Sequence, residues 1–216
     1  MANVKRVTLD VEVKGKFEIP AGLELLQAED MADALETGLA LIKLRIQAGE
    51  RADGAKIFGE TGYSTEPIYI PLTGVGTGNP LAKPRGGRLT RGVKGADPKT
   101  MHFSGGYKEF REKNGRGSSP VNLTLSGNVT GKRFRVIKSD RTGAVAGWQA
   151  GSEQALAAAG LDAREQGQIF SFSPSELDAV YEVLAAAIVD NLEIAGVPRT
   201  QAEKAKIRIK RRKASK

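Results

Sequence analysis

The chain has 216 residues, of which 40% are apolar and 27% are charged, so it is long enough and apolar enough to bury one core. It contains no cysteine, which excludes a disulfide framework, a thiolate metal site and a catalytic thiol. The formal net charge is +8, and eight Lys or Arg residues with no acid lie between Lys204 and Lys216, so the rest of the chain is close to neutral.

Hydrophobic periodicity predicts two elements in the first 50 residues. Between residues 7 and 13 every second residue is apolar, which is the period of a half-buried strand. From Leu25 to Ile46 apolar residues recur at spacings of three and four, which predicts a helix of about 25 residues. Gly49 is the predicted end of that helix.

A long insertion follows, from Ser64 to Gly106. Periodicity fades there and Gly and Pro are frequent, so we predict a loop or hairpin that is anchored on another surface, for instance on a neighbouring subunit. The residues predicted to contact a partner in and just after the insertion are Ile68, Tyr69, Ile70, Leu72, Tyr107 and Phe110.

The second half of the chain predicts short strands between helices. Turn residues separate three β-rich runs, which suggests an antiparallel meander; they lie at residues 121–126, 134–137 and 144–148. Helical segments are predicted at 108–113 and 153–159. Ser173 and Glu176 can form a capping box with Pro174 at the first helical position, so a further helix begins there and ends at Gly196 and Pro198.

This order of elements predicts an α+β fold. A long N-terminal helix and a C-terminal helix are expected to pack on one face of a small antiparallel sheet. We predict a single domain over residues 1–200 with the insertion at 64–106, followed by a basic C-terminal tail at 201–216.

The basic tail has three possible interpretations. It can contact DNA phosphates without sequence preference, or it can be a solvated terminus. Because Ile207 and Ile209 alternate with basic residues, it can also add as a strand to a neighbour's sheet edge. The predicted DNA-facing residues are Lys204, Lys206, Arg208, Lys210, Arg211, Arg212 and Lys213, with Lys132, Arg133 and Arg135 as further candidates.

Signatures of catalysis are weak. His102 is the one histidine, with no second His or Cys to share a metal and no evident partner for acid–base work. The run Gly74–Gly78 lacks both the spacing and the following helix of a phosphate-binding loop, and no Gly-x-Ser-x-Gly elbow occurs. The sequence predicts no enzyme, cofactor, metal or small-molecule substrate. With no apolar run of about 18 residues, it predicts no membrane span.

The segment from Tyr107 to Gly127 is similar to a recurrent segment of phage virion-morphogenesis and tail-completion proteins. In that family a basic Tyr-Lys-x-x-Arg turn precedes Pro-Val-Asn-Leu-Thr-Leu-Thr-Gly. The order of the other pieces also resembles the family: a long helix ending near Ala52-Asp53-Gly54, then this segment, strands, and Phe170-Ser-Phe-Ser before the last helix. The insertion and the basic tail lie outside the resemblance.

The resemblance implies a structural virion protein at the head-to-tail junction, where copies of the chain form a ring of six or twelve around the DNA channel. Its implied neighbours are neck, adaptor or portal, or tail-tube proteins, with packaged DNA contacted non-specifically. The implied location is the virion, and the host cytoplasm during assembly. The alternative is a nucleic-acid-binding protein that acts through its basic tail. An enzyme dependent on His102 is a third interpretation.

Overall fold

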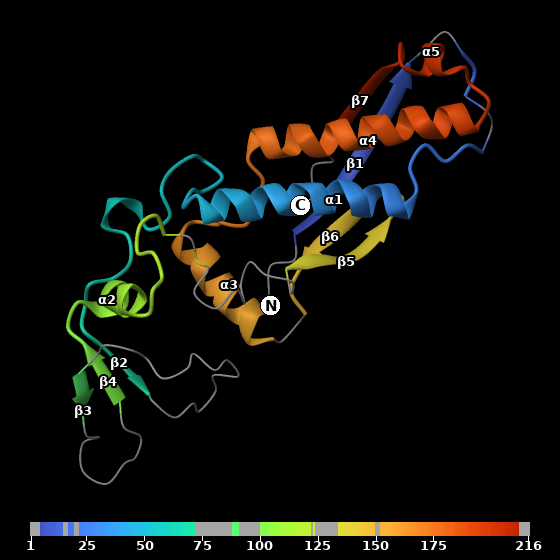
Figure 1. Cartoon of the computed structure of the whole chain (residues 1–216). Helices are drawn as coiled ribbons and strands as arrows, with labels where there is room; N and C mark the ends of the chain where they lie inside the picture. The colour runs from blue at the N-terminus through green and yellow to red at the C-terminus, as the bar shows by residue number, and fades with distance from the viewer. Residues whose placement is uncertain are drawn as a thin grey trace.

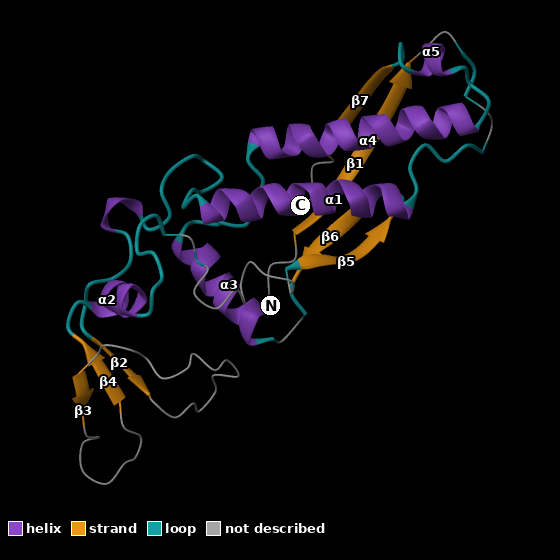
Figure 2. Cartoon of the chain, viewed as in Figure 1, coloured by secondary structure: helices purple, strands orange, loops and turns teal. Residues whose placement is uncertain are grey.

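The structure is a computed structural model of the full chain, and it describes residues 5–14, 17–19, 22–71, 88–90, 100–121, 123, 134–149 and 152–211. In this part of the chain, helices cover one face of a four-stranded sheet, and a smaller three-stranded sheet lies apart from it at one end of the molecule (Figure 1). Helices and strands are distinguished in Figure 2.

The larger sheet has the strand order β5-β6-β1-β7, and each strand is antiparallel to its neighbours. Its strands are β1 (Lys5–Lys14), β5 (Arg135–Asp140), β6 (Gly143–Gly147) and β7 (Lys206–Arg211). β1 pairs with β6 through residues 5–8 and with β7 through residues 9–14, so its two neighbours are staggered along it. The strand predicted at residues 7–13 is confirmed as part of β1.

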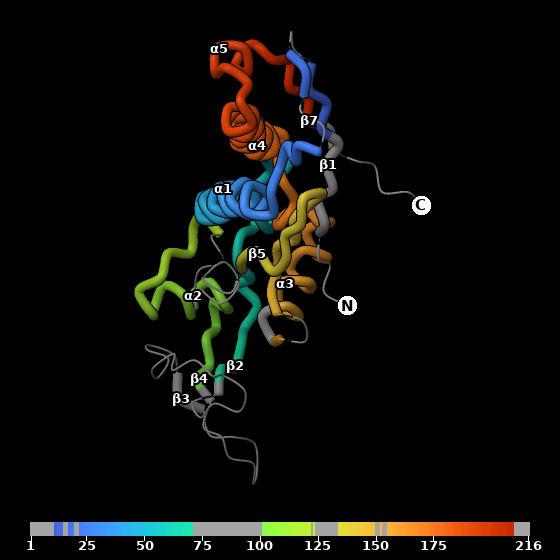
Figure 3. The backbone as a smooth tube through the Cα atoms, turned by 90° about the vertical axis from the view of Figure 1, so that its right-hand side faces the viewer, coloured from blue at the N-terminus to red at the C-terminus, as the bar shows by residue number. Residues whose placement is uncertain are grey.

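Helices α1 (Ala28–Gln47) and α4 (Pro174–Ile194) lie side by side on one face of this sheet, as Figure 3 shows. The capping box predicted for α4 is present: Ser173 Oγ accepts a hydrogen bond from Glu176 N at 3.3 Å, and Glu176 Oε2 accepts one from Ser173 N at 2.7 Å. The predicted α+β fold, with both helices on one face of a small antiparallel sheet, is confirmed.

Two glycines of the helix layer have defined structural roles. Gly49 follows α1 with a φ of +82°, in the left-handed region that glycine adopts without strain, and it ends the helix as predicted. Gly38 lies where α1 meets α4, and a Cβ there would stand 2.5 Å from Phe172 Cε1 and 2.7 Å from Val180 Cγ2. The two helices therefore approach each other at a distance that only glycine permits.

The buried side chains form two clusters. The first lies between α4, the N-terminal half of α1 and the sheet, and it contains Leu35, Leu184 and Ile188. The second surrounds the C-terminal half of α1 and is closed by α3 (Glu153–Arg164). In this second cluster Phe134 stacks on Trp148, with ring centroids 4.5 Å apart.

The smaller sheet is formed by the insertion and has the strand order β2-β4-β3. We call its described residues, 64–71, 88–90 and 100–106, the arm. Its strands are β2 (Ile68–Pro71), β3 (Arg88–Thr90) and β4 (Thr100–Phe103). Three short helices complete the described elements: the 3-10 helix η1 (Gly59–Thr61), α2 (Gly106–Lys113) and α5 (Arg199–Ala202). The arm lies at the end of the molecule opposite α5 (Figure 1).

The helices predicted at 108–113 and 153–159 are confirmed within α2 and α3, and the strands predicted at 134–137 and 144–148 correspond to β5 and β6. The strand predicted at 121–126 is wrong for Val121 and Leu123, which belong to no strand. Leu123 has a φ of +51°, outside the extended region. The other residues of that predicted strand lie outside the described part.

Candidate interaction surfaces

The arm is closed at its base by α2. Gly106, the first residue of α2, has a φ of +68°, and a Cβ there would stand 2.6 Å from the carbonyl oxygen of Ser64 and 2.5 Å from that of Glu66. Two residues further on, Lys108 N donates a hydrogen bond to Ser64 O at 3.1 Å. The two ends of the insertion thus meet at one point, which gives the arm a fixed base.

Aromatic side chains divide the arm into a buried root and an exposed tip. Phe103 is fully buried and packs edge-on against Phe110 of α2, with ring centroids 5.3 Å apart. Tyr69 lies opposite His102 in the ladder of β2 and β4, and their rings are 4.7 Å apart. Tyr69 remains 64% exposed, so it offers a large apolar surface to a partner.

The Tyr-Lys-x-x-Arg motif, on which the resemblance depends, lies within α2 and has a structural role. Arg111 is buried, its guanidinium carbon lies 4.4 Å from the ring centroid of Tyr63, and its Nε donates to Gly117 O at 2.8 Å. Burial raises the pKa of the Tyr107 hydroxyl, while the charge of Arg111 acts in the opposite direction. Arg111 therefore fixes the 115–120 loop against the body of the protein.

The residues predicted to contact a partner differ in exposure. Tyr69 is exposed, Ile68, Ile70 and Tyr107 are half-buried, and Leu72 lies outside the described residues. The prediction for Phe110 is wrong, because this side chain is 2% exposed and belongs to the core between α2 and the arm. Sequence spacing placed Phe110 on α2 but did not indicate which face of that helix is buried.

The basic C-terminal segment is a strand for much of its length, so the prediction of a separate tail is wrong for Lys206–Arg211. These residues form β7, and the register pairs Ile207 with Val13 and Ile209 with Val11 of the chain's own β1. Both isoleucines pack against the first core cluster. The segment therefore adds to a sheet edge of its own chain, and the interpretation in which it adds to a neighbour's sheet in place of its own is wrong; β7 is an end strand of the described sheet, with its outer edge open.

Of the predicted DNA-facing residues, Lys204, Lys206, Arg208 and Arg135 are exposed. Lys204 precedes β7, and Arg135 begins β5. Lys210 and Arg211 belong to β7, with side chains outside the described part. The rest lie outside the described residues: Arg212, Lys213, Lys132 and Arg133.

Two exposed lysines of the same sheet were missed by sequence reasoning. Lys14 ends β1, and its Nζ lies 2.8 Å from Glu12 Oε1, a hydrogen bond that raises the pKa of Lys14. Lys138 lies in β5 after a bulge that follows Val136. The alternation of residues 7–14 placed Lys14 on the polar face of a strand, but it carried no information about which other strand lies beside it.

A cleft of about 330 Å³ lies between the end of α1 and the loops around residues 56–63 and 118–121. It is lined by charged residues that include Lys56, whose Nζ is 3.3 Å from both carboxylate oxygens of Glu60. An exposed ion pair four residues apart is a common surface feature, so we assign the cleft no binding role.

Comparison of the chain with protein-family models, with curated proteins and with solved structures finds no match in any of the three. Within the described residues, no group of three or more His, Asp or Glu side chains is arranged to hold a metal ion. The described helices include none with the length and apolar character needed to cross a membrane.

Proposed function

We propose that the chain is a structural subunit of a tailed bacteriophage, which forms a ring at the head-to-tail junction and uses the arm to contact a neighbour. Six or twelve copies would surround the DNA channel, between the adaptor or portal proteins on one side and the tail tube on the other. The resemblance of the Tyr107–Gly127 segment motivates this proposal, and the arm is the structural observation that carries it.

The described part of the arm buries few side chains. Among its described side chains, Phe103 alone is buried. A sheet of two or three short strands needs a covered apolar face to be stable in water. A neighbouring protein that covers Tyr69 and the half-buried Ile68 and Ile70 would supply that face, which is the role expected of an assembly contact.

The larger sheet offers a way to close a ring. Its end strands, β5 and β7, run in opposite directions, because each step in the order β5-β6-β1-β7 is antiparallel. If β5 of a second copy lay beside β7, the antiparallel alternation would continue across the subunit boundary. Such a contact joins two different surfaces of the chain, and contacts of this kind generate rings when the rotation closes.

The proposal is tested in the phage or prophage that encodes the chain, by disabling the gene and imaging the lysate by electron microscopy. We expect filled heads and complete tails that do not join, with joining restored by the wild-type chain supplied in trans. Infectious, joined particles that form without the chain would overturn the proposal.

The arm is tested by the Tyr69→Ser variant in the same complementation assay. Leu156→Ser is the matched control, because Leu156 is 67% exposed on α3 and lies outside the arm. We expect Tyr69→Ser to reduce the yield of joined particles and Leu156→Ser to leave it unchanged. Equal yields from both variants would show that the tip of the arm makes no assembly contact.

A further inference from the structure

The layer formed by α1 and α4 and the uncovered face of the larger sheet carry opposite charge. The exposed charged residues of the helix layer are all acidic: Glu29, Asp33 and Glu36 on α1, and Asp178, Glu182, Asp190 and Glu193 on α4. Among the described charged side chains of the sheet face that the helices do not cover, five exposed ones are basic and one, Glu12, is acidic. We call this the basic sheet face and define it by Lys14, Arg135, Lys138, Lys206 and Arg208.

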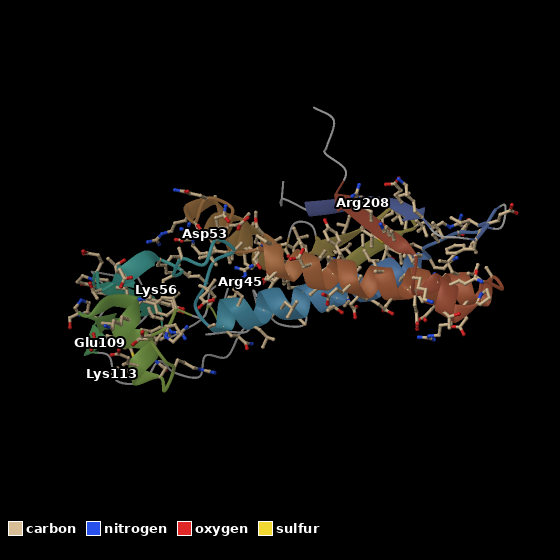
Figure 4. All side chains as sticks on the ribbon, turned by 90° about the horizontal axis from the view of Figure 1, so that it is seen from above. Arg45, Asp53, Lys56, Glu109, Lys113 and Arg208 are labelled. Atoms are coloured by element: carbon tan, nitrogen blue, oxygen red, sulfur yellow. The ribbon has the colours of Figure 1, made fainter. Side chains whose placement is uncertain are left out.

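The alternation of side chains along β1 and β7 shows which of their residues belong to the basic sheet face. Val11 and Val13 of β1 and Ile207 and Ile209 of β7 pack toward the helices, within the first core cluster. Successive side chains of a strand point to opposite faces, so Lys14, Lys206 and Arg208 point away from the helices. Figure 4 shows Arg208 on the side of the sheet opposite α1 and α4.

The register of β5 with β6 shows that two residues of β5 belong to the same face. Arg135 pairs with Gly147, and Lys138 pairs with Val145. Ala144 and Ala146, the two neighbours of Val145 in β6, pack into the core on the helix side, so Val145 faces the other way. Directly paired residues of two strands share a face. Arg135 and Lys138 therefore project from the same face as Arg208.

The cations form a diagonal band across the sheet. Arg208 is paired with Glu12 of β1. Lys138 is paired with Val145 of β6, which is in turn paired with residue 6 of β1. Six residues along a strand and three strand spacings correspond to a diagonal of about 25 Å. This length is shorter than one turn of duplex DNA, about 34 Å, so both ends of the band can contact phosphates within one turn.

The positive charges within this band repel one another. The register puts Lys206 directly opposite Lys14, and like charges at directly opposed positions destabilise a strand pair. The carboxylate of Glu12 offsets part of this repulsion through its ion pair with Lys14. A bound polyanion would offset more of this repulsion, so the electrostatic free energy favours binding of a polyanion to the face.

We propose that the basic sheet face binds the phosphate backbone of duplex DNA without sequence preference. The binding element is a folded sheet surface and not a free tail, and the acidic helix layer orients the subunit with its sheet toward the duplex. This inference goes beyond the ring and does not require it, because the isolated chain has the complete face.

The test is the affinity of the full chain for a fluorescently labelled duplex of about 20 base pairs, measured by anisotropy as a function of salt. The variant is Lys206→Glu with Arg208→Glu. The matched control is Lys56→Glu with Lys113→Glu, which makes the same change in net charge at exposed positions far from the sheet face (Figure 4). Circular dichroism and thermal melting check that each variant is folded.

We expect the sheet-face variant to lose at least about tenfold in affinity and to reduce the slope of log affinity against log salt by about two, since each lost phosphate contact removes about one. The control should retain the wild-type slope. Equal losses in both variants, or no DNA binding by the wild type at low salt, would overturn the proposal. Binding of labelled polyaspartate in preference to duplex would also overturn it, in favour of an acidic protein partner.

If Lys206→Glu with Arg208→Glu does not fold, the milder pair Arg135→Gln with Arg208→Gln replaces it, and a reduced salt slope is again the expected result. Because the assay uses purified chain, its outcome does not depend on particle joining. Absence of DNA binding by the wild-type chain would reject this inference and leave the proposed ring intact, whereas particles that join without the chain would reject the ring and leave this inference intact.

Discussion

Arg45 and Glu176 are 131 residues apart in sequence, and Arg45 Nε lies 2.7 Å from Glu176 Oε1. Their side chains are only 10% and 7% exposed. Glu176 uses its other oxygen to close the capping box of α4, and Arg45 Nη2 donates to the carbonyl oxygens of Ile169 and Ser171 at 3.2 and 2.7 Å. One guanidinium therefore joins the end of α1, the start of α4 and the segment before α4.

Replacing Arg45 by Met should lower the free energy of unfolding by about 3–5 kcal/mol, because Glu176 would remain buried without its cation. Urea unfolding measures the change. Lys56→Met is the control, since it removes an exposed pair with Glu60 and should cost less than about 1 kcal/mol. Equal effects of the two substitutions would mean that the buried pair does not hold the helices together.

Gly38→Ala should destabilise the protein although alanine is the better helix former. The new Cβ would stand 2.5 Å from the Phe172 ring, and overpacking of this kind costs about 1–3 kcal/mol. Gly160→Ala in α3 is the control, because a Cβ there has nothing within 4 Å and should stabilise by about 0.5–1 kcal/mol. Thermal melting of both variants gives the comparison, and a stabilising Gly38→Ala would contradict the observed helix contact.

Gly106→Ala should loosen the base of the arm. Gly106 and Gly115 both have a φ of +68°, so alanine pays the same conformational cost of about 1–2 kcal/mol at each position. Only at Gly106 would the Cβ also collide with the carbonyl oxygens of Ser64 and Glu66. We expect limited proteolysis to cleave the arm of Gly106→Ala faster than that of Gly115→Ala, and similar rates would argue against a closed base.

The contribution of Asp53 to stability should depend on pH. Its hydrogen bond from Arg51, together with one from Ala55 N, holds the pKa of Asp53 below its usual value of 3.8. A lowered pKa in the folded state means that this contribution is present above pH 3.8 and is lost as the pH falls through the lower value. The difference in melting temperature between wild type and Asp53→Asn should therefore shrink on acidification from about pH 7 to about pH 3. A constant difference would contradict this assignment.

Local signals in the sequence were enough to predict most of the elements. The capping box at Ser173 and Glu176 was predictable because both partners lie within one turn of the same helix. The helix near residues 25–46 was predictable because its buried face repeats at helical spacing. In both cases the information lies within a few residues of the element itself.

Contacts between distant segments were not predictable. Nothing near Arg45 indicates that its partner is Glu176, because that pairing depends on how α1 crosses α4. The charges of residues 204–216 suggested a free tail. Two isoleucines of this segment instead pack against the first core cluster, and the segment pairs with β1 as a strand. The basic sheet face was missed for the same reason, since its residues come together only when β5 and β7 take their places in the sheet.

The pairing of β1 with β7 has a consequence for folding. About 200 residues separate the paired positions, so closing this part of the sheet costs more chain entropy than forming any hairpin in the molecule. During synthesis, about 190 further residues must be added after residues 9–14 before the strand that pairs with them emerges from the ribosome. Until then they present an unpaired strand edge, and this interval is when the nascent protein is most exposed to misassociation or to capture by a chaperone.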